Sequence, residues 1–141
     1  MKVLFDVNVI LDVLLARKGF AEVSASLMSK VESGSVSGYL CATTVTTLDY
    51  LLSKALSKNQ ARDATKKLLE LFKVADVNER VLQLSINSKF GDFEDAVQYY
   101  SGQLSGVDCI VTRNIKDFKN VELPVYNPEE LLGIIESTRV N

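Results

Sequence analysis

Carboxylate side chains in this sequence stand at places where catalytic and metal-binding groups commonly lie. Asp6 directly follows the apolar run Val3-Leu4-Phe5, Asp95 stands near the start of an expected helix, and Asp49 lies within another. The sequence contains no histidine, so imidazole can neither ligate a metal nor transfer a proton. Carboxylate oxygens suit hard cations such as Mg²⁺ and Mn²⁺. Such a cation can activate water and neutralise charge on a phosphoryl group.

Each of these acids also has an ordinary structural interpretation. Asp6 is a favoured residue type for a helix N-cap, although Asn8 could cap that helix by itself. Asp92 and Asp95 have the spacing of a capping box. Asp49, on the edge of an apolar helical stripe, needs water, an ionic partner or a metal. The residues alone therefore leave helix caps and metal ligands both open.

A polar segment follows the clearest apolar run, Cys109-Ile110-Val111. It contains Arg113, Asn114, Lys116 and Asp117 and ends at Phe118. Turn formation, with Phe118 in the core, would account for this segment. The same residues could also form an edge that faces phosphate groups, since Arg and Lys make most backbone contacts to nucleic acids.

Short apolar strands that alternate with helices must position these side chains. The spacing predicts strands at 3–5, 37–42, 74–75 and 108–112, with an edge strand at 125–126. It predicts helices at 8–17, 21–32, 45–56, 59–72, 78–87, 92–104 and from Asn127 onward. This alternation indicates an α/β layer fold with a mostly parallel sheet. Ligands gather at the carboxyl ends of such strands, where Asp6 and the 112–114 segment fall.

Composition narrows the class of protein further. The 141 residues are 47% hydrophobic and 24% charged, which is typical of one globular domain. Sixteen basic and 18 acidic residues give a net charge of -2, so any contact with nucleic acid must be local or bridged by metal. Cys41 and Cys109 are expected to be buried free thiols. No apolar run is long enough for a signal peptide or a membrane span, so we expect a cytoplasmic protein.

Four segments in this order resemble the PIN domain family. They are Val3–Asn8, Cys41–Val45 with Asp49, Asp92–Ala96, and Ile110–Asn114 with Asp117-Phe118. The resemblance spans Lys2 to about Leu132 and implies that residues 1–141 form a single PIN-like domain. It implies a three-layer fold, with a central, mostly parallel sheet of four to five strands flanked by helices. It also implies a ribonuclease dependent on Mg²⁺ or Mn²⁺, which in bacteria is often the toxin of a toxin–antitoxin pair.

The resemblance assigns roles residue by residue. Asp6 and Asp95 match two of the family's acids, and Asp49 falls where the family usually has Glu. Asn114 stands where many members carry a fourth acid, and Asp117 serves nearby or holds the loop. Asp6, Asp49 and Asp95 are therefore the expected catalytic residues. Substrate contacts are expected from Asn8, Arg113 and Lys116, and metal ligation from Asp6, Asp49, Asp95, Asn114 and Asp117.

The implied partners are RNA and an antitoxin protein, and a homodimer stays open. One alternative function is a catalytically weak or silent PIN-like module that binds RNA or a protein. A phosphatase of the haloacid dehalogenase type also places an acid after its first strand. That family usually needs Asp-x-Asp, and Asn8 occupies the second place here, which argues against it.

Overall fold

The computed structural model describes residues 1–138 and has a parallel sheet at its centre. The strand order is β3-β2-β1-β4-β5, and every neighbouring pair is parallel. The strands are β1 (Lys2–Phe5), β2 (Ser37–Cys41), β3 (Lys73–Ala75), β4 (Cys109–Val111) and β5 (Val125–Tyr126). This confirms the predicted α/β class and strand number, and the carboxyl ends of all strands share one edge.

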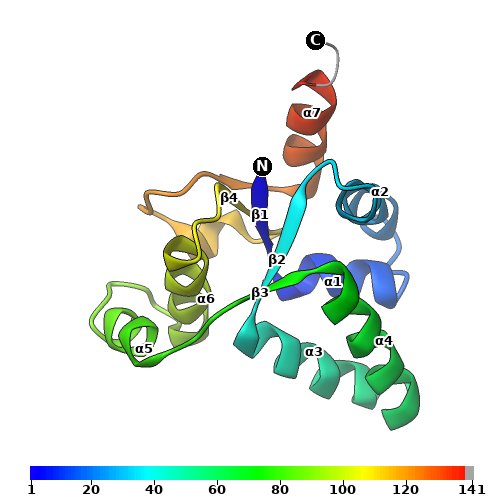
Figure 1. Ribbon diagram of the computed structural model, residues 1–141, viewed down its shortest axis with the longest axis horizontal. Coiled ribbons are helices and arrows are strands. Elements are labelled where there is room, and N and C mark those ends of the chain that lie inside the picture. The colour runs from blue at the N-terminus through cyan, green and yellow to red at the C-terminus, as the bar shows by residue number, and fades with distance from the viewer. Residues whose placement is uncertain (139–141) are drawn as a thin grey trace.

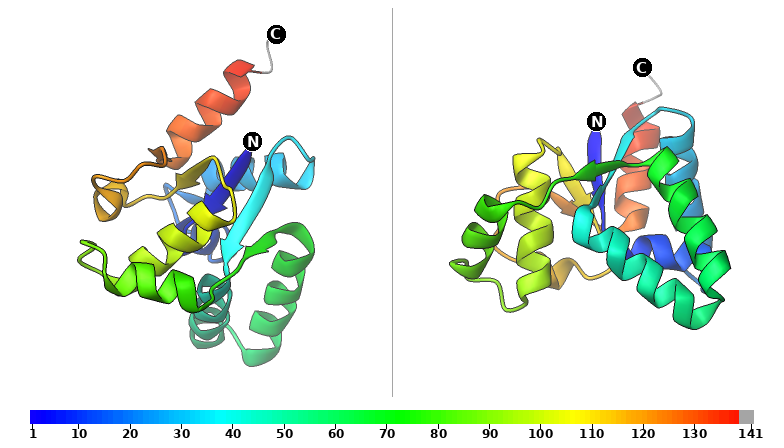
Figure 2. Two further views of the ribbon diagram at one scale, coloured as in Figure 1. Left: turned by 60° about the vertical axis from the view of Figure 1, so that its left-hand side comes forward. Right: turned by 60° about the horizontal axis from the view of Figure 1, so that its bottom comes forward.

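Helices cover both faces of this sheet, so the fold has three layers (Figures 1 and 2). The chain forms α1 (Val7–Leu14), α2 (Ala21–Glu32), α3 (Ala42–Ala55), α4 (Lys58–Leu71), α5 (Glu79–Ile86), α6 (Phe93–Leu104), the 3-10 helix η1 (Ile115–Phe118) and α7 (Pro128–Thr138). In Figure 1, α5 and α6 lie on one side of the sheet, opposite α1 to α4.

Strand β1 shows how the sequence builds this sandwich. Val3 and Phe5 pack in the larger core with residues of α1, α2, α3, α4 and α7. Leu4 points to the other face, where it packs with Tyr99 of α6 and Phe118 of η1. All three β1 residues are fully buried. An apolar run buried on both faces is typical of a central parallel strand.

Most predicted helices agree closely with the structure. Helix α2 has the expected bounds, Asn78 and Asp92 cap α5 and α6 as expected, and the chain leaves α6 at Gly106 with φ +82. Asn127 forms reciprocal hydrogen bonds with Glu130 at the start of α7. These elements were predictable because their caps and apolar spacing are local signals.

Three helix starts differ from the prediction. Helix α3 begins at Ala42, before the threonines expected to start it, and its N-cap residue Cys41 makes no side-chain cap. Ser57 caps α4 in place of Asn59, and α1 begins at Val7, with Asp6 as the cap, which is one of the two candidates that the sequence offered. The early start of α3 matters most, because it fixes which side chains α3 presents to the sheet edge.

Two general expectations can also be compared with the described residues. Cys41 and Cys109 are buried free thiols, as expected. Burial, with the nearby Asp108 carboxylate, raises the pKa of the Cys109 thiol to about 11. Between residues 1 and 138, no helix has the length and apolar character needed to cross a membrane.

Candidate active site

Asp6 is held rigidly at the carboxyl end of β1. One carboxylate oxygen accepts a hydrogen bond from the Val7 N–H at 2.7 Å and caps α1. The other accepts from the Thr112 hydroxyl at 2.6 Å and from the Asn8 amide at 3.2 Å. Asp6 is 6% exposed. Capping and a catalytic role are thus compatible, because this network fixes the carboxylate while leaving it at the rim of a cavity.

Asp95 stands in the first turn of α6 with several acids around it. Its backbone N–H donates to the Asp92 carboxylate, which is the cap of this helix. Burial, the largest cause, raises the pKa of Asp95, and the nearby charges of Asp92, Asp117, Asp6 and Glu94 raise it too; together they bring it from 3.8 to about 7. These carboxylates repel one another without a cation to offset them. The arrangement therefore favours binding of a positive ion.

A small cavity of about 60 Å³ brings Asp6 and Asp95 together. Helix α3 contributes three threonines to its wall, and α6 contributes two acids and a glutamine. The amide nitrogen of Gln98 is buried and has no hydrogen-bond partner within residues 1–138. The lining residues are Asp6, Val7, Thr43, Thr44, Thr47, Glu94, Asp95 and Gln98. The unsatisfied amide indicates that the cavity is completed by a polar ligand or water.

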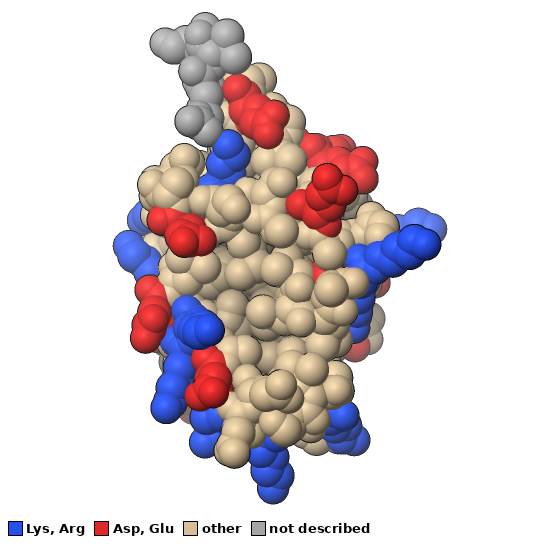
Figure 3. Space-filling view, turned by 90° about the vertical axis from the view of Figure 1, so that its right-hand side faces the viewer, with Lys and Arg blue, Asp and Glu red and all other residues tan. Residues whose placement is uncertain are grey.

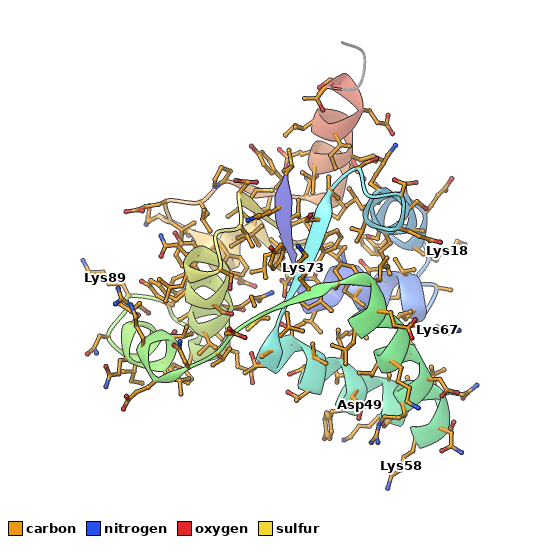
Figure 4. The ribbon with its side chains drawn as sticks, viewed as in Figure 1. Lys18, Asp49, Lys58, Lys67, Lys73 and Lys89 are labelled. Atoms are coloured by element: carbon orange, nitrogen blue, oxygen red, sulfur yellow. The ribbon has the colours of Figure 1, made fainter. Side chains whose placement is uncertain are left out.

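The structure does not bring Asp49 to this cavity. Its carboxylate accepts a hydrogen bond from Thr65 of α4 at 3.2 Å and lies 3.6 Å from the Arg62 guanidinium. Figure 4 shows Asp49 beside α4, on a later turn of α3. The reason is helical register: six residues after Thr43, a side chain points about 240° around the axis and lies about 9 Å further along it. The expected convergence of three carboxylates thus reduces to Asp6 and Asp95.

Arg113 is turned away from the cavity. Its guanidinium donates two hydrogen bonds to Asp12 of α1, at 2.6 and 3.1 Å, and lies 4.0 Å from the ring centre of Phe20. Asp12 is 0% exposed and also pairs with Arg17 at 3.4 Å. A buried carboxylate needs such partners. Arg113 is therefore engaged by Asp12, which leaves it poorly placed for the substrate contact expected of it.

The other predicted site residues have varied positions. Asn8 bridges the Asp6 carboxylate, the Thr112 hydroxyl and the Arg113 N–H. Asp117 is exposed and close enough to raise the pKa of Asp95. The Asn114 backbone N–H donates to Thr112, and its exposed side chain does not line the cavity. Lys116 is exposed at a neighbouring, larger cavity together with Asp117.

The donor set at the cavity fits a magnesium-type ion. Within residues 1–138, no three His, Cys, Asp or Glu side chains gather as a closed metal cage. Mg²⁺ does not need one, because it keeps several waters and commonly takes only one or two carboxylates. Asp6 and Asp95 would hold it directly, and the threonine hydroxyls could hold its waters.

Sequence reasoning missed several residues that the structure places at or behind this site. Glu94 is exposed and also lines the cavity. Thr112 is fully buried and orients Asp6. Gln98 carried no signal in the sequence. Asp12, inside the apolar run Ile10–Leu14, did carry one, because a charge there requires a partner.

A comparison with known proteins assigns the family. Residues 2–116 match the PIN domain family, and the chain belongs to it. The chain is 25% identical over 134 residues to Ribonuclease VapC1 of Aquifex aeolicus (strain VF5), and the match covers 92% of each protein.

Solved structures confirm the fold. A chain of a toxin–antitoxin complex from Klebsiella pneumoniae has a TM-score of 0.68 and 20% identity, over 89% of this chain and 97% of that one. Mycobacterium tuberculosis VapC20, described as a sarcin–ricin loop cleaving toxin, has a TM-score of 0.66 and 12% identity, over 86% and 98%. At these identities the likeness shows a shared fold.

Proposed function

We propose that this PIN domain is a metal-dependent ribonuclease and the toxin component of a toxin–antitoxin pair. The observation that carries the proposal is the convergence of Asp6 and Asp95 on one cavity at the carboxyl ends of the strands. The raised pKa of Asp95 also supports the proposal, because it reflects a group of acids with no positive charge beside them. Similarity to Ribonuclease VapC1 and to a toxin–antitoxin complex supports both parts.

The residues at the cavity have separable tasks in this function. Mg²⁺ or Mn²⁺, when bound, would activate water and neutralise charge on the scissile phosphate. Asp6 and Asp95 would hold the ion, and Thr112 and Asn8 would keep the Asp6 carboxylate in one orientation. Glu94 and Asp117 add negative charge around it. With an ion held between them, these acids would repel the RNA backbone less.

An antitoxin and a homodimer are the expected protein partners. The face on the right-hand side of Figure 1 is uncharged at its centre and has Lys, Arg, Asp and Glu around it (Figure 3). Such a surface suits a protein better than RNA, because RNA affinity depends on positive charge. Cleavage would then be measured on the chain freed from its antitoxin.

A second candidate is a PIN-like module that binds RNA or a protein and does not cleave. The observation in its favour is that α3 presents Thr43, Thr44 and Thr47 at the cavity and no acid. The experiment that separates the two is cleavage of a mixed RNA substrate with added Mg²⁺ or Mn²⁺. Wild-type protein should cleave and Asp95→Asn should not. Binding of the ion without cleavage by the wild type would favour the silent module.

Asp49→Asn is the matched control for that experiment. It removes one carboxylate from the same protein, at a site bound to Thr65 and Arg62 and separate from the cavity. We expect this variant to retain cleavage within a few-fold. Loss of cleavage in both variants alike would mean that Asp49 belongs to the site.

A further inference from the structure

We propose that Gln98 of α6 binds the scissile phosphate, by donating a hydrogen bond from its amide nitrogen to a non-bridging oxygen. The inference rests on the proposed ribonuclease function and assigns a further residue to it. Three features of residues 1–138 carry it. The amide nitrogen has no acceptor, no cationic side chain lines the cavity, and close packing fixes the helix that carries Gln98.

The amide nitrogen of Gln98 is a buried donor that the protein leaves unpaired. Gln98 is 5% exposed, and none of the residues from 1 to 138 accepts a hydrogen bond from this nitrogen. A buried donor without an acceptor is costly, so buried amides are normally bonded. Gln98 also lines the cavity that Asp6 and Asp95 share. The missing acceptor is therefore a ligand of that cavity.

The chemistry of this donor identifies the ligand as an anionic oxygen. An amide nitrogen only donates, so it cannot ligate a cation. The carboxylate oxygens of Asp6 already accept hydrogen bonds at 2.7 and 2.6 Å, and Asp95 would hold the ion. The group that remains is the RNA phosphate, whose negative oxygens accept strongly from N–H donors.

The cavity wall lacks a cation that could bind this phosphate. Within residues 1–138 its lining contains neither Lys nor Arg, and the Arg113 guanidinium is bonded to Asp12. With an ion held by Asp6 and Asp95, one non-bridging oxygen is neutralised and the other still needs a donor. A neutral amide can supply it without repelling the ion beside it, which a lysine or arginine would do.

Helix α6 holds Gln98 in a fixed relation to both acids. Asp95 and Gln98 are three residues apart on α6, so they share one face, with ~5–6 Å between their Cβ atoms. One turn later, Gly102 packs so closely on β1 that a Cβ there would lie 2.8 Å from Leu4 Cδ2. This contact sets α6 against the strand that ends at Asp6. A donor positioned in advance needs no reorganisation when substrate binds.

Gln98→Met separates phosphate binding from a structural role. Met has a similar length and no amide, and the wild-type amide nitrogen has no partner to lose within residues 1–138. The melting temperature in chelator should therefore be unchanged or higher. Cleavage should fall about 100-fold, as when one positioned donor to an oxyanion is removed. A lower melting temperature would show that Gln98 is a structural residue and would overturn the proposal.

Gln103→Met is the matched control. Gln103 lies on the same helix, outside the cavity that contains Asp6 and Asp95. The same substitution there should leave cleavage within a few-fold of wild type. Equal losses of cleavage in Gln98→Met and Gln103→Met would place the effect in α6 as a whole and overturn the proposal.

A phosphorothioate at the mapped cleavage position tests the hydrogen bond itself. Sulfur accepts hydrogen bonds weakly, so replacing the contacted oxygen should slow the wild type about tenfold. The same replacement should have little effect on Gln98→Met, which has no donor to lose. Sulfur at the other non-bridging position should slow both proteins equally. Equal effects in both proteins at both positions, or full cleavage by Gln98→Met, would overturn the proposal.

Gln98→Glu distinguishes donation to phosphate from ligation of the ion. The substitution adds a third acid beside Asp6 and Asp95, so Mg²⁺ should raise the melting temperature more than it does in wild type. Cleavage should fall at least as far as in Gln98→Met, because a carboxylate cannot donate and repels the phosphate. Wild-type cleavage by Gln98→Glu would mean that the side-chain oxygen acts, and would overturn the proposal.

Nuclear magnetic resonance reports the contact without cleavage. The side-chain amide signal of Gln98, assigned by its absence in Gln98→Met, is followed in Ca²⁺, which should support cleavage poorly. It should shift when a single-stranded RNA oligonucleotide is added, and a signal that RNA leaves unchanged would overturn the proposal. If wild type cleaves no RNA in Mg²⁺ but the signal still shifts with RNA, the ribonuclease function fails and the phosphate contact stands. Cleavage by wild type without that shift would mean the reverse.

Discussion

Replacing Asp95 by Asn should stabilise the metal-free protein, although Asp95 is expected to be essential for cleavage. The substitution removes one charge from a group of acids and leaves the cap of α6 intact, because Asp92 accepts from the backbone N–H of residue 95. No hydrogen bond to the Asp95 carboxylate is formed within residues 1–138. The change therefore isolates the electrostatic cost of this charge.

The magnitude follows from the raised pKa. A shift from 3.8 to about 7 is about three pH units, and each unit corresponds to ~1.36 kcal/mol. The upper bound is therefore about 4 kcal/mol. Asp95 is only partly buried, and screening by water reduces the gain on substitution to about 1–2 kcal/mol. For a chain of this length the melting temperature should rise by about 3–6 °C.

The pH dependence has a definite sign. Between pH 3.8 and about 7 the folded state binds the Asp95 proton more tightly than the unfolded state. This contribution to stability is present at pH 4 and is lost as the pH rises through 7. The advantage of Asp95→Asn over wild type should therefore be largest above pH 7 and smallest near pH 4.

The assay is thermal unfolding in excess chelator, followed by circular dichroism, at several pH values. Asp49→Asn serves as the control and should show no stabilisation, because Asp49 is paired with Arg62. Adding Mg²⁺ should raise the melting temperature of the wild type and leave Asp95→Asn nearly unchanged. If Asp95→Asn melts below the wild type at pH 8 in chelator, the acids do not repel one another as described.

Three further predictions concern the groups around the site. Thr112→Val should lower cleavage about 10–100-fold with the fold retained, because Asp6 loses its 2.6 Å hydrogen bond, and Thr112→Ser should restore activity. Asp12→Ala should destabilise the protein by about 3 kcal/mol in denaturant unfolding, since it strands the Arg113 guanidinium beside Phe20; an unchanged midpoint would contradict this. Ca²⁺ should raise the melting temperature of the wild type but support cleavage poorly, and equal rates in Ca²⁺ and Mg²⁺ would argue against a Mg²⁺-type site.

The sequence predicted the order of elements well because the signals are local. Helix α2 has an apolar residue at every turn of one face, and its bounds came out correctly. The run Cys109-Ile110-Val111 has no polar residue and forms β4, which is buried on both faces. Caps such as Asn78 and Asp92 were predictable for the same reason, since their partners lie three residues away.

The site was less predictable because it depends on register and on distant partners. Helix α3 starts without a side-chain cap at Cys41, so nothing local marked its first residue. The position of Asp49 in that helix decides which way its side chain points. Arg113 and Asp12 are 101 residues apart, and no spacing rule connects them. Thr112 and Asp6 meet only because β1 and β4 are neighbours in the sheet.

The most direct test of the account is cleavage of single-stranded RNA by wild type, Asp95→Asn and Asp49→Asn, each with Mg²⁺ and with excess chelator. The account predicts cleavage by wild type and Asp49→Asn in Mg²⁺, none by Asp95→Asn, and none by any of them in chelator. Equal cleavage by wild type in chelator, or full activity of Asp95→Asn, would contradict it.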